Sequence, residues 1–171
     1  MNSPEQHKSA PVRPSLKKVA LGSPAGFLAF GFGSGLSPFA PGTMGTLVAI
    51  PFIFVLKEMG NPGFWVVLVL LFLLGVKLCG DVSRKLGVHD HGGIVWDEMV
   101  GYWLSAAFVP LQWPWLLAAF LLFRFFDIVK PWPIRQLDKE VSGGFGIMID
   151  DVVAALFTVA ILAVLQSFWG V

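Results

Sequence analysis

Apolar residues form five runs along this chain, separated by short polar or turn-forming stretches. The stretches GNPG at 60–63 and PLQWP at 110–114 mark tight connections between consecutive runs. Such runs predict membrane helices, although several are shorter than the roughly 20 residues that a full crossing needs. The runs cover residues 46–57, 64–78, 94–109, 114–128 and 149–168. We therefore predict an all-α, polytopic helical membrane protein with about four or five short spans.

The chain before the first run divides into two parts. Residues 1–18 are polar and contain proline, which is typical of a flexible tail. Residues 19–33, VALGSPAGFLAFGFG, are apolar but hold one proline and four glycines. They predict a short interfacial or re-entrant helix rather than a cleaved signal peptide. Residues 19–171 are then a single helical membrane domain that follows the tail.

Composition supports a bilayer environment. Hydrophobic residues make up 56% of the chain and charged residues only 13%, whereas a soluble domain averages about 25% charged residues. No basic cluster with interleaved aromatic residues is present, so we expect no nucleic-acid partner. The single cysteine, Cys79, excludes an intrachain disulfide.

The distribution of basic residues predicts the orientation in the membrane. If 60–63 and 110–114 lie on one side, the tail and the loops 79–93 and 129–148 lie on the other. Lys57 is near the first side. The positive-inside rule places the other, basic side in the cytoplasm. That side holds the remaining eleven Lys and Arg residues: Lys8, Arg13, Lys17, Lys18, Lys77, Arg84, Lys85, Arg124, Lys130, Arg135 and Lys139.

Acidic residues stand at the cytoplasmic ends of three predicted helices. They are Asp97 and Glu98, Asp127, and Asp150 and Asp151. Acids at helix starts also stabilise the helix dipole, but this does not account for Asp127, which is near a helix end. Carboxylates from several helices are the hard oxygen ligands of a divalent cation. We predict a metal site formed by all five residues.

Several further polar residues suit a phosphate group. Arg124, Asp127 and Lys130 recur at intervals of three, on one side of a helix. Alternatively, Arg124 pairs with Asp127 while Lys130 reaches the membrane interface. Thr43 belongs to APGTMG, a glycine-rich helix entrance whose free N–H groups can bind an anion. Arg135 follows in the same basic loop as Lys130.

Two histidines, His89 and His91 in the segment VHDH, precede Asp97 in the chain. They are candidates for proton transfer, and the alternative is a solvated loop. No cysteine or histidine partners complete a zinc site around them.

Familiar phosphate chemistries are missing from the sequence. There is no Walker A motif and no G-x-S-x-G elbow. Cys79 lies in an apolar helix, which argues against a thiolate nucleophile. Metal-assisted chemistry on a phosphorylated lipid remains. The alternatives are an ion- or proton-coupled transporter, for which membrane acids are also usual, and a noncatalytic assembly subunit.

Three polar blocks resemble the bacterial phosphatidylglycerophosphatase A family: GFGSGLSPFAPGTMGT, GVHDHGGIVWDEMVGYW and FRFFDIVKPWPIRQLDKEVSGGFGIMIDDVVA. The resemblance runs from about Phe30 to the last apolar run. It implies a magnesium-dependent lipid phosphatase of the bacterial inner membrane. Such an enzyme hydrolyses the terminal phosphate of phosphatidylglycerophosphate, a phospholipid substrate in the bilayer, to phosphatidylglycerol. The acidic positions that match the family are Asp97, Glu98, Asp127, Asp150 and Asp151.

The resemblance and the residue types together suggest a role for each candidate site residue. Asp97, Asp127 and Asp150 are the expected Mg²⁺ ligands, with Glu98 and Asp151 as further ligands or residues that orient water. The phosphates are held by Arg124, Lys130 and Arg135, with Thr43 at the helix entrance. His89 or His91 protonates the leaving alkoxide. The sequence leaves open the number of metal ions, attack by water or by a carboxylate, and the oligomeric state.

Overall fold

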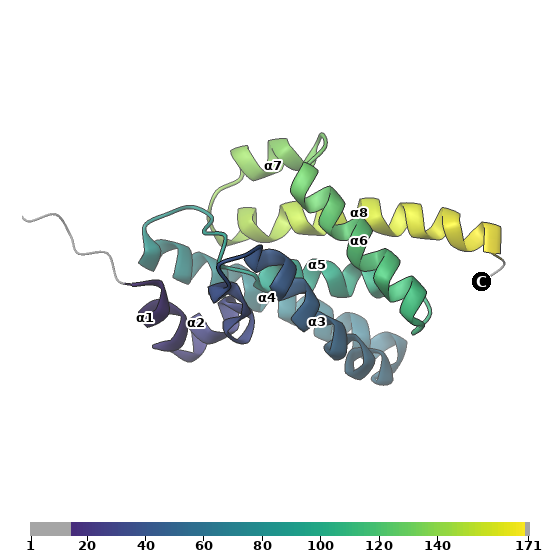
Figure 1. The fold of residues 1–171 in the computed structure, drawn as a ribbon, viewed down its shortest axis with the longest axis horizontal. Coiled ribbons are helices and arrows are strands. Elements are labelled where there is room, and N and C mark those ends of the chain that lie inside the picture. Colours follow the sequence, from purple (N-terminus) through teal and green to yellow (C-terminus); the bar gives the residue numbers. More distant parts are fainter. Residues whose placement is uncertain (1–14, 170–171) are drawn as a thin grey trace, which may run out of the picture.

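The computed structural model describes residues 15–169, and helices account for all of their regular structure. Figure 1 shows an elongated bundle in which α8 extends along the long axis and α1 and α2 lie at one end. The elements are α1 (Leu16–Leu21), α2 (Pro24–Ala29), the 3₁₀ helix η1 (Gly31–Leu36), α3 (Pro41–Glu58), α4 (Gly60–Leu86), α5 (Trp96–Ala106), α6 (Trp113–Val129), α7 (Ile134–Glu140) and α8 (Gly143–Trp169). The predicted all-α class is confirmed.

The segment predicted as one interfacial or re-entrant helix is divided into three short ones. The Ser23 hydroxyl accepts a hydrogen bond from the Gly26 amide and so begins α2, with Pro24 in its first turn. Gly31 and Gly33 have positive φ, which ends α2 and turns the chain. Helix α1 takes in the last residues of the predicted tail. The tail before Ser15 lies outside the described residues.

Helix α5 is the centre of the bundle. It packs against α3, α4, α6 and α8, and nine of its residues are buried. Its 11 residues span only about 17 Å at 1.5 Å per residue, less than the hydrocarbon thickness of a bilayer. The other helices therefore carry the contact with lipid, and α5 supplies the interior.

Glycines let the backbones approach closely around this centre. A Cβ on Gly144 of α8 would lie 1.8 Å from the Val76 carbonyl oxygen of α4. A Cβ on Gly101 of α5 would lie 2.6 Å from the Phe123 ring of α6. Small residues at helix crossings are the usual means of tight packing in membranes. They bring α4, α5, α6 and α8 together near one end of the bundle.

Polar groups inside the bundle find partners within it. The indole N–H of Trp103 donates to the Ala49 carbonyl at 2.9 Å, and that of Trp96 donates to the Leu71 carbonyl at 3.1 Å. The buried hydroxyls of Thr46, Ser105 and Thr158 donate to carbonyls four residues earlier. Internal satisfaction of this kind is required where water is absent.

The outer surface is apolar along whole helix faces. Helices α4 and α8 are long and apolar enough to cross a membrane, and the predicted count of four or five spans stays a prediction. Exposed apolar residues recur at helical spacing, as expected of a face that contacts lipid. They include Val66, Val69, Leu70 and Leu73 on α4, and Leu117, Leu121, Phe125 and Ile128 on α6.

Side chains from different helices meet at each end of the bundle. At one end the Trp65 ring packs 5.3 Å from Phe108, and the Trp115 ring packs 6.2 Å from Trp169. At the other end the loop after α4 meets the start of α8, since the His89 ring accepts a hydrogen bond from the Gly143 amide at 3.2 Å. The end of α6 meets α8 through the ion pair of Lys130 with Asp150. The assignment of these ends to the two sides of the membrane stays a prediction.

The orientation is tested by labelling exposed positions at each end. We expect Gln112→Cys, in a Cys79→Ala background, to react with an impermeant maleimide in intact spheroplasts, because few basic residues accompany it. Ser142→Cys should react only after permeabilisation. Both positions are exposed. Labelling of Ser142→Cys alone in intact spheroplasts would reverse the orientation.

Candidate active site

The five acids predicted as a cluster come together at one end of the bundle. Asp97 and Glu98 are in the first turn of α5, Asp127 is in the last turn of α6, and Asp150 and Asp151 are in the third turn of α8. Ligand oxygens of Asp97, Glu98 and Asp151 lie within 4.8 Å of one another, and so do those of Asp127, Asp150 and Asp151. Antiparallel packing of α6 against α5 and α8 thus unites residues that are far apart in sequence.

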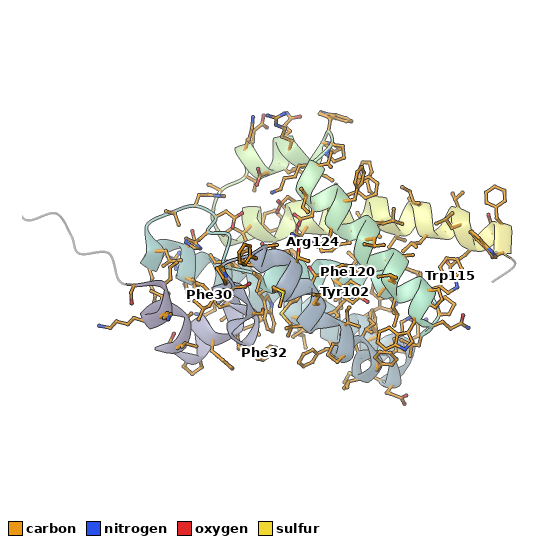
Figure 2. The ribbon with its side chains drawn as sticks, in the orientation of Figure 1. Phe30, Phe32, Tyr102, Trp115, Phe120 and Arg124 are labelled. Atoms are coloured by element: carbon orange, nitrogen blue, oxygen red, sulfur yellow. The ribbon has the colours of Figure 1, made fainter. Side chains whose placement is uncertain are left out.

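Arg124 lies between two of these acids. Its Nη1 atom is 2.5 Å from Asp127 Oδ2 and 3.5 Å from Glu98 Oε1. Figure 2 shows Arg124 in the middle of the bundle, on the same helix as Trp115 but towards the opposite end. The ion pair with Asp127 confirms the Arg124 part of the alternative arrangement, whereas Lys130 contacts Asp138 and Asp150. The contact with Glu98 joins α5 to the Arg124–Asp127 pair.

Lys130 links the cluster to α7. It follows the last turn of α6 with a left-handed backbone, φ 46°, so it does not continue the helical face of Arg124. Its ammonium contacts Asp150 at 2.6 Å and Asp138 of α7 at 2.8 Å. Burial opposes the charge, but the two carboxylates outweigh it and raise the pKa of Lys130 above its ordinary value. Lys130 therefore stays charged.

Several buried polar atoms of the cluster have no hydrogen-bond partner among the described residues. They are Asp97 Oδ1, Glu98 Oε2, Asp150 Oδ1, Asp151 Oδ2, and Nε and Nη1 of Arg124. Arg124 Nη1 is near its acids but not directed at them for a hydrogen bond. Buried polar atoms normally have partners. Free carboxylate oxygens from three helices fit a hard divalent cation, and the free guanidinium N–H groups fit an anion.

The start of α3 closes the cluster from a third side. A Cβ on Gly42 would lie 2.1 Å from Glu98 Oε1 and 3.0 Å from both terminal nitrogens of Arg124. The predicted residue Thr43 follows it and is half-buried. The first N–H groups of a helix have no partner within that helix. Gly42 therefore lets these donors come close to the guanidinium.

Two residues of the predicted phosphate site, Lys130 and Arg135, line a cavity beside the acidic cluster. Arg135 of α7 is exposed and lines a cavity of about 500 Å³ together with Lys130, Trp132 and Lys139. Since Lys130 also touches Asp150, this cavity adjoins the acidic cluster. Three of its lining residues are basic, Lys130, Arg135 and Lys139, and one, Glu140, is acidic, so the net charge of the lining is positive.

The histidines lie in the loop between α4 and α5. His91 accepts a hydrogen bond from the Gly93 amide through Nδ1 at 3.0 Å, and His89 accepts one from the Gly143 amide through Nε2. Among the described residues, no hydrogen bond or ion pair joins either ring to the five acids. A role for them in proton transfer stays a prediction.

The structure adds two residues to the predicted set. Asp138 is the second partner of Lys130, and Gly42 is the point where α3 meets Glu98 and Arg124. Asp138 could not be separated from the other charged residues of IRQLDKE by pattern alone. Gly42 belongs to the glycine-rich segment APGTMG. That segment predicts the start of a helix, but the sequence does not show that Gly42 packs against Glu98 and Arg124.

Comparison with known proteins identifies the family. The sequence pattern described as phosphatidylglycerophosphatase A matches residues 27–166. The chain belongs to the phosphatidylglycerophosphatase A family. All five acids, both histidines, Arg124, Lys130, Arg135 and Thr43 lie within the matched residues.

Two relatives that carry this family name align with this chain over most of their length. The phosphatidylglycerophosphatase A of Haemophilus influenzae is 51% identical over 156 residues, which cover 90% of this chain and 95% of the relative. That of Escherichia coli is 45% identical over 153 residues, 89% of each chain. A Bacteroides thetaiotaomicron protein, named provisionally as a phosphatidylinositol-3-phosphatase, is 39% identical over 92% of this chain and 99% of its own length. No solved structure matches the chain.

Gly42 offers a test of the site geometry. We expect Gly42→Ala to lower the free energy of unfolding by about 1–3 kcal/mol, because the added methyl group overpacks the contact with Glu98 and Arg124. Gly92→Ala is the matched control, since a Cβ there meets open space. The measurement is thermal unfolding in detergent. Equal melting of both variants would contradict the close approach of α3.

Proposed function

We propose that this chain hydrolyses the terminal phosphate monoester of phosphatidylglycerophosphate in a Mg²⁺-dependent reaction at the cytoplasmic face of the bacterial inner membrane. The products are phosphatidylglycerol and inorganic phosphate. The observation that carries the proposal is the buried cluster of five carboxylates with Arg124 at one end of an apolar bundle. The names of two relatives supply the substrate.

Mg²⁺ is the metal that we assign to the acids. Asp97, Asp127 and Asp150 would hold it, with Glu98 and Asp151 as additional ligands, because their free oxygens come from three helices. When bound, Mg²⁺ would polarise the phosphoryl group and activate water. The carboxylates themselves exclude any anion from the site until a cation neutralises them.

Arg124 would orient the reacting phosphate. Glu98 and Asp127 fix its guanidinium, while its Nε atom keeps a free donor. The start of α3 at Gly42 lies beside it, and Thr43 is the next residue of that helix. Donors placed in advance around a phosphoryl group stabilise the charge that develops in the transition state.

One of the histidines would return a proton to the leaving alkoxide of the lipid. The hydrogen bond that His91 accepts at Nδ1 leaves the proton of a neutral ring on Nε2, and the bond that His89 accepts at Nε2 leaves it on Nδ1. Each ring thus keeps one N–H for donation.

The basic cavity on α7 would bind the second phosphate of the substrate. Phosphatidylglycerophosphate carries a diester beside its terminal monoester, and Arg135 with Lys139 lies in the cavity next to Lys130. Trp132, which is 78% exposed, suits the membrane interface. A phosphoinositide that is phosphorylated on its ring also joins a monoester to a diester, so all three relatives are named for one headgroup pattern.

A transporter remains the alternative class. Transporter sites lie near the bilayer midplane, whereas these acids gather at one end of the bundle. The phosphatase names of the relatives also favour the enzyme.

Substitution of the acids tests metal-dependent catalysis. Asp97→Asn, Asp127→Asn and Asp150→Asn should each lower phosphate release by more than about 100-fold, because changes one shell further out already cost 10–100-fold. Asp81→Asn is the control: Asp81 pairs with Lys77 and Arg84 on α4, and its loss should leave turnover nearly unchanged. The assay is Mg²⁺-dependent phosphate release, with a thermal melt of each variant. Near-normal turnover in all three folded variants would remove the proposal.

Headgroup selection tests the role of α7. We expect a higher kcat/KM for phosphatidylglycerophosphate than for phosphatidic acid in the same mixed micelles, because phosphatidic acid lacks the second phosphate. Arg135→Gln should lower the ratio of the two kcat/KM values by about tenfold, because it removes one charge-assisted contact with the second phosphate. Arg84→Gln, also exposed, is the matched control. An unchanged ratio in Arg135→Gln would exclude Arg135 from headgroup binding.

A further inference from the structure

The five carboxylates form two overlapping sets rather than one. Asp97, Glu98 and Asp151 form the first set, and Asp127, Asp150 and Asp151 form the second. Within each set the ligand oxygens are within 4.8 Å of one another. Opposite ligands of an octahedral Mg²⁺ are roughly 4.2 Å apart, twice the usual metal–oxygen distance. The 4.8 Å limit is slightly wider than this spacing, so a small closing movement would let each set surround one ion, and only Asp151 belongs to both.

Both sets contain buried oxygens that lack a partner. In the first set these are Asp97 Oδ1 and Glu98 Oε2, and in the second set Asp150 Oδ1, while the shared Asp151 contributes Oδ2. Asp97, Asp150 and Asp151 are 6%, 4% and 2% exposed. A single ion in either set would leave a buried carboxylate oxygen of the other set without a partner, which is costly.

The cations already present do not remove this requirement. Arg124 reaches Glu98 through Oε1 and Asp127 through Oδ2, and Lys130 reaches Asp150 through Oδ2. Each contact uses one oxygen of its carboxylate. Glu98 and Asp150 therefore keep the other oxygen for a metal ion. Asp97 and Asp151 have no ion-pair partner among the described residues.

Charge balance also favours two ions. Six carboxylates, the five of the cluster and Asp138 beside Lys130, face two cations, Arg124 and Lys130, which leaves four negative charges if all are ionised. One divalent cation would leave two negative charges and repel a phosphate dianion. Two would neutralise the site and remove this repulsion.

From this arrangement we propose that the site binds two divalent cations, one in each set, with the Asp151 carboxylate bridging them. The proposal rests on the metal dependence proposed above and fixes its stoichiometry. In general, two-metal phosphatase sites hold the attacking and leaving oxygens of a phosphoryl transfer between their ions.

The number of ions can be measured without catalysis. Mn²⁺ replaces Mg²⁺ at oxygen sites, and the full chain in phosphatidylcholine nanodiscs avoids binding to anionic lipid. Electron paramagnetic resonance of free Mn²⁺ gives the stoichiometry, and the spectrum of bound Mn²⁺ reports spin coupling between neighbouring ions. We expect two bound ions per chain with a coupled spectrum.

Variants assign the two positions. Asp97→Asn and Asp127→Asn should each reduce binding from two ions to one and abolish the coupling, because each removes a ligand of one set only. Asp151→Asn should weaken both ions. Asp81 lies outside both sets, so the Asp81→Asn variant should still bind two coupled ions.

Wild-type protein alone decides the proposal, whether or not the variants fold. If one ion binds and Mn²⁺ or Mg²⁺ stimulates phosphate release, the proposed second metal site is wrong and the proposed phosphatase function stands. Two ions without coupling would overturn the Asp151 bridge. No bound ion, with phosphate release insensitive to EDTA, would overturn both this inference and the proposed metal dependence.

Discussion

Mutual repulsion among five buried carboxylates is the constraint on which this structure depends. The acids come from α5, α6 and α8, and an unpartnered ion in a low-dielectric interior costs several kcal/mol. Arg124 and Lys130 offset part of that cost through Glu98, Asp127 and Asp150. The remaining oxygens are available to cations from solution. A fold that gathers so much charge of one sign gives up stability to keep these acids together.

Close helix packing is what makes the cluster possible. Glycines at 42, 101 and 144 remove the side chains that would otherwise separate α3, α6 and α8 from their neighbours. Because van der Waals contact rather than the hydrophobic effect holds helices together in lipid, these contacts supply stability as well as proximity. The short α5, enclosed on all sides, can then present Asp97 and Glu98 at its first turn. The glycines that allow close helix packing therefore also determine where the acidic residues lie.

The surface divides according to what each part meets. Apolar faces of α4 and α6 suit hydrocarbon, whereas the end with the acids carries α7, with its basic cavity and exposed Trp132. A phospholipid headgroup lies at the boundary between these two environments. Lys130 joins them physically, since its ammonium contacts Asp150 in the cluster and Asp138 on α7. One side chain therefore connects the cavity at α7 with the acidic cluster.

The sequence by itself determined the helical class and singled out the five acids that lie together in the structure. Hydrophobic runs report burial in lipid, and a carboxylate beside such a run is too costly to be accidental. Periodicity could not give the division of residues 19–33 into three short helices, where Ser23 and Pro24 begin a new one. Only the tertiary structure separated the acids into two sets, placed Gly42 against Glu98 and Arg124, and paired Lys130 with Asp138. These relations depend on distances between helices that are remote in sequence, and side-chain packing rather than local pattern sets such distances.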